Sequence, residues 1–321
     1  MGTEVWLWIG FHVLVAGMLA IDLGIFQRHA HRISIREAAV WSVVWVGTAL
    51  VFNAGVWWLR GSQAGLEWLT GYLIEKALSV DNLFVFLVIF TYFAVPAHLQ
   101  PRVLKWGILG AVLMRASLIA IGAVLVHRFH WILYLFGAFL VYTGFKLLRH
   151  THETVDPSRN RALLFVRRFW PVTEDYGRGA FFEQRGGRLW VTPLVLVLVA
   201  IETTDLVFAL DSIPAIFAIT RDPFIVYTSN IFAILGLRAM FFLLAGILDM
   251  FRFLKYGLSV VLMFIGAKML ISDVYKIHVG VSLGVVALIL AVSVLASIFV
   301  PKPAEATLNV PESADAPKTG G

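Results

Sequence analysis

The sequence predicts an all-α fold: a polytopic transmembrane helical bundle of nine spans that contains an inverted repeat of three helices. The chain has 321 residues, of which 60% are hydrophobic and 14% charged, and its mean hydropathy is +0.84. This is more apolar than a soluble domain needs to be. Nine stretches reach the length of about 20 residues that spans a bilayer as a helix. In addition, acidic, basic and glycine motifs recur in two blocks of three stretches.

The predicted spans cover 5–26, 38–59, 71–93, 103–126, 129–148, 191–219, 224–248, 253–272 and 279–300. The first stretch follows Glu4 rather than a basic segment and is too long for a cleaved signal core, so we expect it to be retained. Residues 1–300 are therefore expected to form a single transmembrane domain. It includes a longer cytoplasmic connection at 149–190, and a disordered cytoplasmic tail at 301–321 follows it.

The distribution of Lys and Arg predicts the orientation, because positively charged loops stay in the cytoplasm. With the N-terminus outside, the inside segments carry 17 of these residues. The outside loops carry only Arg60, Arg128, Arg221 and Lys276. This asymmetry accounts for most of the net charge of +6, so we expect no nucleic-acid partner. The chain has no cysteine, which excludes disulfides, thiolate ligands and thiol redox chemistry.

A pair of acids six residues apart occurs twice. Glu75 and Asp81 in the third span correspond to Asp205 and Asp211 in the sixth. The spans that follow agree in order and spacing: Arg115 with Arg238, Tyr134 with Tyr256, Gly144 with Gly266, and Lys146 with Lys268. Spans 3–5 are therefore predicted to repeat as spans 6–8.

The two repeat units cover about 71–148 and about 191–272. Each unit has three helices, so the second must cross the membrane in the opposite sense to the first. Inverted repeats bring equivalent segments together near the bilayer centre, where transporters commonly bind their substrate. We therefore expect the two acidic helices to face each other.

The third and sixth spans contain five acids: Glu75, Asp81, Glu202, Asp205 and Asp211. A carboxylate at the centre of a membrane helix costs about 3 kcal/mol even on insertion scales. Grouped carboxylates also repel one another unless a cation or protons lie between them. Oxygen ligands suit Mn, Mg or Ca, and Asn82 and Ser212, which follow the second acid of each pair, could add neutral oxygens. The sequence predicts a divalent-cation site made of these seven residues.

The same acids could instead neutralise five basic residues within the spans: Lys76, Arg115, Lys146, Arg238 and Lys268. The clustering of the acids on two helices favours the ion site. We interpret Lys146 and Lys268 as supporting cations that balance the acids when no metal is bound. Arg115 and Arg238 are interpreted as supporting residues that tie helices together.

Residues six apart on a helix are separated by about 9 Å along its axis and about 120° around it. One face of an ideal helix therefore cannot hold both Asp205 and Asp211. Either the sixth span is buried over a wide arc, or it is interrupted near the second acid. Pro214 favours an interruption there.

The stretches 71–82, 202–217 and 228–238, which carry these motifs, resemble the TerC family of membrane proteins. Over residues 5–300 the arrangement is similar to the Alx branch of that family, found in the bacterial inner membrane. The resemblance implies Mn(II) export and metal homeostasis, and it places the acidic positions of the family on the four repeated acids. The resemblance also links the chain to tellurium-ion resistance through the family and to a redox-modulator role through the Alx branch.

The residues and the resemblance together predict a secondary transporter that exports Mn(II) from the cytoplasm, coupled to protons, by alternating access. Manganese(II) is then the transported substrate, no organic cofactor is expected, and the lipid bilayer is the other partner. We expect no enzyme, because the chain has no His-Glu-x-x-His motif and no cysteine that could pair with a histidine. One alternative is a non-transporting accessory protein whose acids form internal salt bridges. A less favoured one is an intramembrane aspartyl hydrolase, which needs only two carboxylates.

Overall fold

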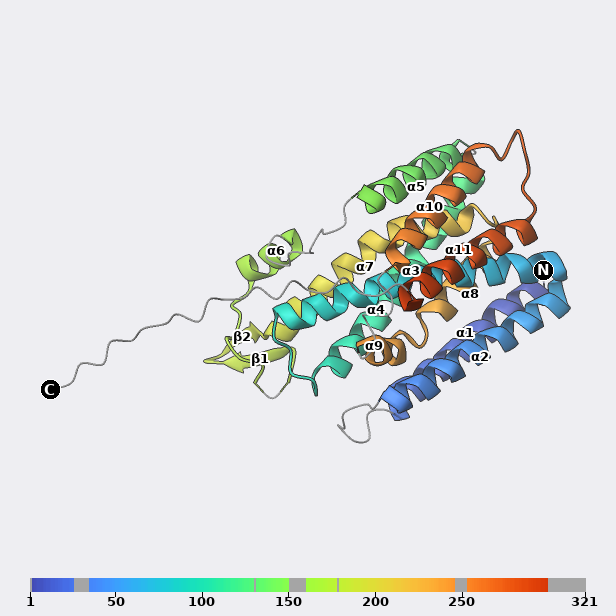
Figure 1. Ribbon diagram of the computed structural model, residues 1–321. Helices are drawn as coiled ribbons and strands as arrows, with labels where there is room; N and C mark the ends of the chain where they lie inside the picture. Colours follow the sequence, from blue (N-terminus) through green and yellow to red (C-terminus); the bar gives the residue numbers. More distant parts are fainter. Residues whose placement is uncertain are drawn as a thin grey trace.

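The computed structural model describes residues 2–25, 35–129, 131–149, 160–177, 179–245 and 253–299, with the backbone alone at residues 2–4, 22–25 and Asp81. The predicted tail at 301–321 lies outside these residues. The described helices are α1 (Gly2–Ile25), α2 (Ile35–Arg60), α3 (Ser62–Tyr92), α4 (Gln100–Arg128), α5 (Ile132–Arg149), α6 (Arg161–Phe169), α7 (Pro193–Phe217), α8 (Pro223–Ile234), α9 (Leu237–Ala245), α10 (Leu254–Leu270) and α11 (Val279–Phe299) (Figure 1).

Within the described residues, each of the nine predicted apolar stretches is helical over most of its length, and the seventh is divided into α8 and α9. The predicted helical class is therefore confirmed. Within the described residues, α2, α4, α5, α7 and α11 are long and apolar enough to cross a membrane. The pair α8 and α9, bent by 42°, would be a sixth crossing if it forms one span. The total of nine crossings stays a prediction.

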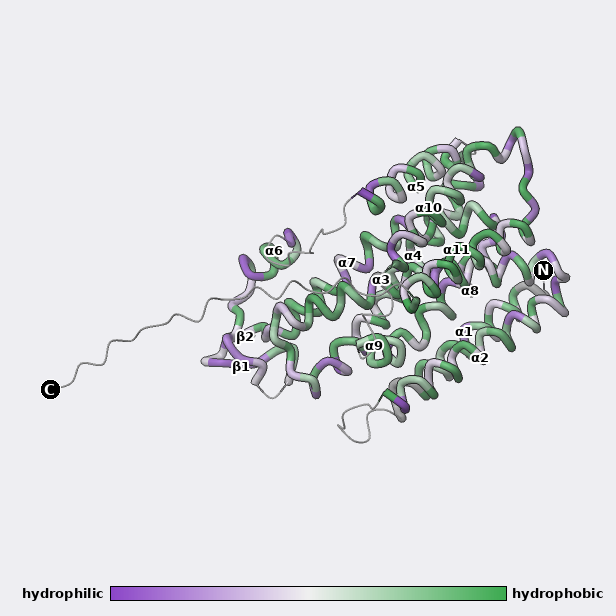
Figure 2. The backbone as a smooth tube through the Cα atoms, viewed as in Figure 1, coloured by the Kyte–Doolittle hydropathy of each residue, from purple (hydrophilic) through white to green (hydrophobic). Residues whose placement is uncertain are grey.

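The helices consist mostly of apolar residues, and hydrophilic residues gather toward the ends of the bundle (Figure 2). Large hydrophobic side chains point outward from several helices: Val51 is 74% exposed, Leu113 72% and Leu288 65%. Soluble monomers rarely expose contiguous apolar surface of this kind. A bilayer solvates such side chains, so the chain is an integral membrane protein.

The connection before α7 contains α6 and a hairpin of β1 (Phe182–Arg185) and β2 (Arg188–Val191). We did not expect these strands. Gly186 and Gly187 form their two-residue turn with φ of 57° and 74°, and a Gly-Gly pair is a common signal for such a hairpin. The Tyr176 hydroxyl donates to the carbonyl of Phe93 at 2.5 Å, which ties the connection to the end of α3.

Helices α3 and α8 lie side by side and run in the same direction. The indole of Trp68 donates to the hydroxyl of Thr228 at 3.0 Å, and two turns later the ammonium of Lys76 donates to the carbonyl of Ala233 at 3.1 Å. Residue numbers therefore increase in the same direction along α3 and α8, so the two helices are parallel. This pairing brings the third predicted span against the first half of the seventh.

Helices α4 and α7 also run in the same direction. A Cβ at Gly107 would lie 3.2 Å from Ile201, and a Cβ at Gly122 would lie 2.8 Å from Phe217. The absence of a side chain at these positions lets the two helices approach closely. This contact brings the fourth predicted span against the sixth.

Helices α5 and α10 pack antiparallel through glycines. A Cβ at Gly144 would lie 2.7 Å from the carbonyl oxygen of Ser259, and a Cβ at Gly266 would lie 2.6 Å from that of Gly137. The repeat pairs Gly144 with Gly266, and the same spacing pairs Gly137 with Ser259. Replacing each residue by its repeat equivalent therefore turns the Gly144–Ser259 contact into the Gly266–Gly137 contact.

The helix break lies in the seventh span, and the predicted interruption near Pro214 is wrong. Helix α7 continues through Pro214, which sits in its last turn, where the missing N–H removes only one bond to the preceding turn. Between α8 and α9, Gly236 has φ of 84°, a conformation that side chains other than glycine rarely adopt. The side chain of Trp45 lies 2.7 Å from the position that a Cβ on Gly236 would take.

Candidate ion-binding site

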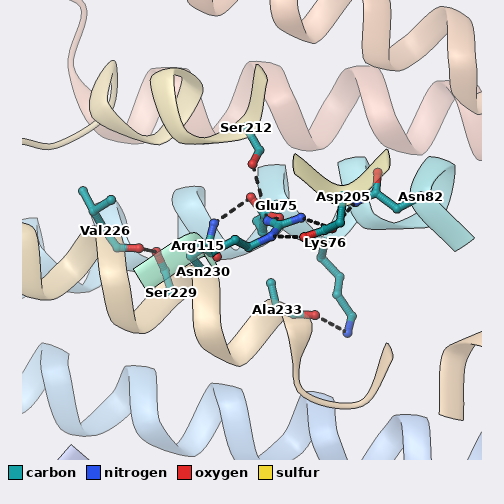
Figure 3. Close-up of polar contacts among 10 residues, drawn as sticks. All are labelled: Glu75, Lys76, Asn82, Arg115, Asp205, Ser212, Val226, Ser229, Asn230 and Ala233. Carbon is teal, nitrogen blue, oxygen red and sulfur yellow. Dashed lines mark hydrogen bonds and ion pairs between the residues drawn. The ribbon is translucent and has the colours of Figure 1, made fainter. Parts of the chain in front are cut away.

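Arg115 of α4 binds one acid from each of the two acidic helices (Figure 3). Its Nε and Nη2 donate to Oδ2 and Oδ1 of Asp205 on α7, at 3.1 and 2.9 Å. Its Nη1 donates to Oε1 of Glu75 on α3. Arg115 and Glu75 are fully buried, and Asp205 is 2% exposed. The expected approach of the two acidic helices is therefore present, and an arginine lies between their carboxylates.

Two neutral residues that occupy equivalent positions in the repeat lie next to this arginine. The Oγ of Ser212 accepts from Arg115 Nη1 at 3.4 Å. In one orientation of its amide, Asn82 donates to Asp205 Oδ1 at 3.4 Å. In the opposite orientation its oxygen accepts from Arg115 Nη2 at 3.3 Å and its nitrogen donates to the carbonyl of Leu78 at 3.0 Å. We favour the second, because an oxygen then faces the guanidinium.

Two further buried polar side chains lie on α3 and α8, and one of them contacts Glu75. The Nδ2 of Asn230 on α8 donates to Glu75 Oε2 at 2.9 Å. Ser79 lies one turn after Glu75 on α3. Asn230 and Ser79 are both fully buried, and within the described residues Asn230 Oδ1 and Ser79 Oγ have no hydrogen-bond partner. Unpaired polar atoms are costly in an apolar interior, so these oxygens are suited to a positively charged ligand.

We call Glu75, Asp205, Arg115, Asn82, Ser212, Asn230 and Ser79 the central cluster. Its formal charge is −1, because two carboxylates oppose one guanidinium. Lys76 follows Glu75 in the chain and points elsewhere, to the carbonyl of Ala233 near the C-terminal end of α8 (Figure 3). Because α8 ends at the break before α9, the carbonyls of its last turn have no partner in a following turn. A cation is also favoured at the negative, C-terminal end of a helix.

Residues 60–305 match the integral membrane protein TerC family. The chain belongs to the TerC family. A TerC relative from Myxococcus xanthus, an uncharacterized membrane protein, is 51% identical over 312 residues, which cover 97% of this chain and 96% of the relative. A relative from Escherichia coli K12 is 52% identical over 290 residues, 87% of this chain and 90% of the relative, and its name proposes a membrane-bound redox modulator, Alx. No solved structure matches the chain.

The other two predicted acids of α7 in this TerC protein lie outside the central cluster. Asp211 has a hydrogen bond with Thr143 and an electrostatic attraction to Lys146, both on α5. Glu202 is half-buried and lies against Gly110 of α4, where a Cβ would collide with its carboxylate. As the helix geometry predicted, the acids six residues apart on α7 face different neighbours.

The remaining predicted residues are spread over the TerC bundle. Lys268 on α10 is buried and is attracted electrostatically to Glu67, while Arg238 is buried at the start of α9. Asp81 lies in α3, but its side chain is outside the described part of the structure. No group of three or more Asp, Glu, His or Cys side chains that could hold a metal occurs among the described residues. The predicted seven-residue ligand set therefore stays a prediction.

Sequence reasoning gave Arg115 a supporting role and left Asn230, Ser79 and Lys76 out of the site. Two signals could have identified these residues. Asn230 ends a run of three polar residues in a span whose only charged residue is Arg238. Ser79 follows Glu75 at the four-residue spacing that places two side chains on one helix face. No sequence signal indicates which carboxylates a buried arginine will pair with.

Proposed function

We propose that this TerC protein is a secondary transporter that exports a divalent metal from the cytoplasm, with Mn(II) as substrate and protons as the coupling ion. The observation that carries this proposal is that Glu75 and Asp205 share one cation, the guanidinium of Arg115. These acids come from equivalent positions in two repeated units, and together they bind one positive charge inside an apolar bundle. Such buried ionisable residues commonly mark ion pathways.

The packing of the helices supports an inverted repeat. Helix α3 pairs with α8 as α7 pairs with α4, and both pairs are parallel. The contact between α5 and α10 is antiparallel and reciprocal. Two units related by a two-fold axis in the membrane plane would have these directions. Transporters of this design bind substrate between the repeats and alternate access by moving one repeat against the other.

The chemistry of the central cluster supports a hard cation. Its candidate ligands are carboxylate, amide and hydroxyl oxygens, which suit Mn, Mg and Ca. The names of the Alx relatives propose a redox role, but this chain has no cysteine with which to perform thiol chemistry. The choice of Mn(II) among the hard cations, and the direction of export, rest on the resemblance to the family.

We assign the protein to the bacterial inner membrane with a periplasmic N-terminus and a cytoplasmic C-terminus. The relatives are bacterial, and the Lys and Arg residues favour this orientation. In this orientation α7 begins on the cytoplasmic side, and Glu202 lies closer to the cytoplasm than Asp205.

The test is cation flux into proteoliposomes that contain the purified protein, measured for Mn(II), Mg, Ca, Zn and Fe with and without a pH gradient. We expect Mn(II) flux that a pH gradient drives, and its loss in Asp81→Asn and in Asp211→Asn. The alternative is a non-transporting accessory protein. One observation favours it: Arg115 already neutralises part of the buried acidic charge. Absence of flux for every cation in folded wild-type protein would support that role and refute transport.

A further inference from the structure

Arg115 and a transported cation would compete for the same two carboxylates. We propose that Arg115 is a tethered cation that a divalent metal replaces between Glu75 and Asp205, and that Glu202 receives Arg115 when the metal binds. This inference rests on the proposed transport function and adds to it an exchange of one cation for another.

The charges favour such an exchange. Arg115 leaves the pair of Glu75 and Asp205 with one uncompensated negative charge, whereas a divalent ion would neutralise both carboxylates. Charge imbalance is expensive at low dielectric, so the metal matches the pair better than the guanidinium does. Without either cation the carboxylates would repel each other. Arg115 therefore keeps the site assembled while no metal is bound.

The unpartnered oxygens point to the same occupant. Asn230, whose Nδ2 binds Glu75, and Ser79, one turn after Glu75 on α3, are fully buried. Within the described residues, Asn230 Oδ1 and Ser79 Oγ have no hydrogen-bond partner. Mn(II) takes about six oxygen ligands, more than two carboxylates supply in monodentate binding. These two oxygens would add to the metal's ligands. Within the described residues Arg115 donates to neither of them.

Glu202 lies where Arg115 could reach it. It precedes Asp205 by three residues on α7, about 4.5 Å along the axis and on the same face. It contacts Gly110, which precedes Arg115 by five residues on α4. Glu202 therefore precedes Asp205 on α7, and Gly110 precedes Arg115 on α4. Because α4 and α7 run in the same direction, Glu202 lies toward the same end of the bundle from Asp205 as Gly110 does from Arg115. Glu202 was predicted above to be a metal ligand, and we assign it instead as the second partner of Arg115.

The test is the affinity of purified full-length protein for Mn(II), measured by equilibrium dialysis. Arg115→Gln removes the competitor, so we expect Mn(II) to bind at least about tenfold tighter, as the loss of a charge-assisted hydrogen bond to the carboxylates implies. Arg60→Gln is the matched control, because Arg60 pairs with Asp222 at 2.7 Å, outside the central cluster, and its loss should leave the affinity unchanged. Unchanged or weaker binding in Arg115→Gln would overturn the proposal.

If Arg115→Gln does not fold, Arg115→Lys gives the same test. A lysine keeps the charge but cannot bind both carboxylates through a planar fork, so Mn(II) should still bind tighter than in the wild type. Unchanged or weaker binding in Arg115→Lys then overturns the proposal.

Glu202→Gln tests the second half of the exchange. Without its second partner Arg115 stays on the carboxylate pair, so we expect several-fold weaker Mn(II) binding in Glu202→Gln and no further change when Glu202→Gln is added to Arg115→Gln. If Glu202→Gln weakens Mn(II) binding equally in the wild type and in Arg115→Gln, Glu202 binds the metal directly. That result would overturn its role as the second partner of Arg115.

Flux in wild-type proteoliposomes separates this inference from the proposed function. Mn(II) flux in the wild type together with unchanged affinity in Arg115→Gln overturns the tethered cation and leaves transport standing. Absence of divalent flux in folded wild-type protein overturns transport and the exchange with it.

Discussion

The two repeated units contain the same arginine motif, yet the helix that carries it is continuous in one unit and broken in the other. Leu113-Met-Arg115 lies inside α4, whereas Gly236-Leu-Arg238 lies at the junction of α8 and α9. Leucine at the first position stays helical, and glycine takes a positive φ that ends the helix. The break therefore coincides with a position at which the two related spans differ, leucine in one and glycine in the other.

This difference gives the two units different chemistry. The continuous α4 presents Arg115 to acids from both acidic helices. The broken span presents carbonyls instead, and Lys76 donates to one of them, on Ala233. The comparison teaches that a sequence repeat does not make the two halves of a site equivalent.

The largest expected effect comes from removing the arginine of the continuous unit. Arg115→Met should lower the free energy of unfolding by about 3–5 kcal/mol, because it leaves two buried carboxylates without their cation. Thermal unfolding in detergent, followed by circular dichroism, measures this. Adding Glu75→Gln and Asp205→Asn should recover most of the loss, since no buried charge is then unpaired. Wild-type stability of Arg115→Met alone would contradict the assigned role of the charge.

The next effect comes from closing the break. Gly236→Ala should cost about 2 kcal/mol of unfolding free energy, because alanine is strained at positive φ and its Cβ would meet Trp45. Gly284→Ala is the matched control: a Cβ there would meet nothing within 4 Å, and α11 is helical. If both variants unfold like the wild type, Gly236 does not enforce the break.

A smaller effect is expected at the carbonyl end of α8. Lys76→Met should cost about 1.5 kcal/mol, because it removes a charge-assisted bond to the Ala233 carbonyl. Lys105→Met on α4 is the control for loss of a lysine charge and should change unfolding less. Equal effects in the two variants would show that Lys76 gives no specific support to the break.

The smallest expected effect comes from giving the continuous unit the glycine of the broken one. Leu113→Gly should cost about 1 kcal/mol, the ordinary penalty of glycine inside a helix. We expect α4 to stay continuous, because α4 as a whole packs against α7 and nothing at position 113 holds a positive φ. Spin-label distances between the two ends of α4 measure this. A shortened distance would show that glycine alone is sufficient to break the span.

The sequence was sufficient for the helices and for the pairing of the acidic spans. Apolar length located the membrane-length helices but not the short α6, and the repeated acids correctly predicted that α3 and α7 meet. For α7 the sequence leaves open burial over a wide arc or a break, and Pro214 favours the break because proline is a strong helix breaker. The position of Gly236 was not recognised, since a positive φ depends on what packs beside the chain, here Trp45.

The central cluster could be predicted only in part. Glu75, Asp205, Asn82 and Ser212 were identified from the repeat, and the structure brings them together around Arg115. The spacing also indicated that Asp211 would face another way. The choice of Arg115 as the shared cation depends on which helix lies between α3 and α7, and no local pattern in the sequence contains that information.

The most direct test of the central claim is Mn(II) flux in proteoliposomes with Glu75→Gln and with Asp205→Asn. Asp222→Asn is the control, because Asp222 pairs with Arg60 away from the cluster and asparagine can still cap α8. The two acids are proposed to bind the ion together, so each cluster variant should lose flux while remaining folded, and the control should retain it. Wild-type flux in both cluster variants would contradict the account.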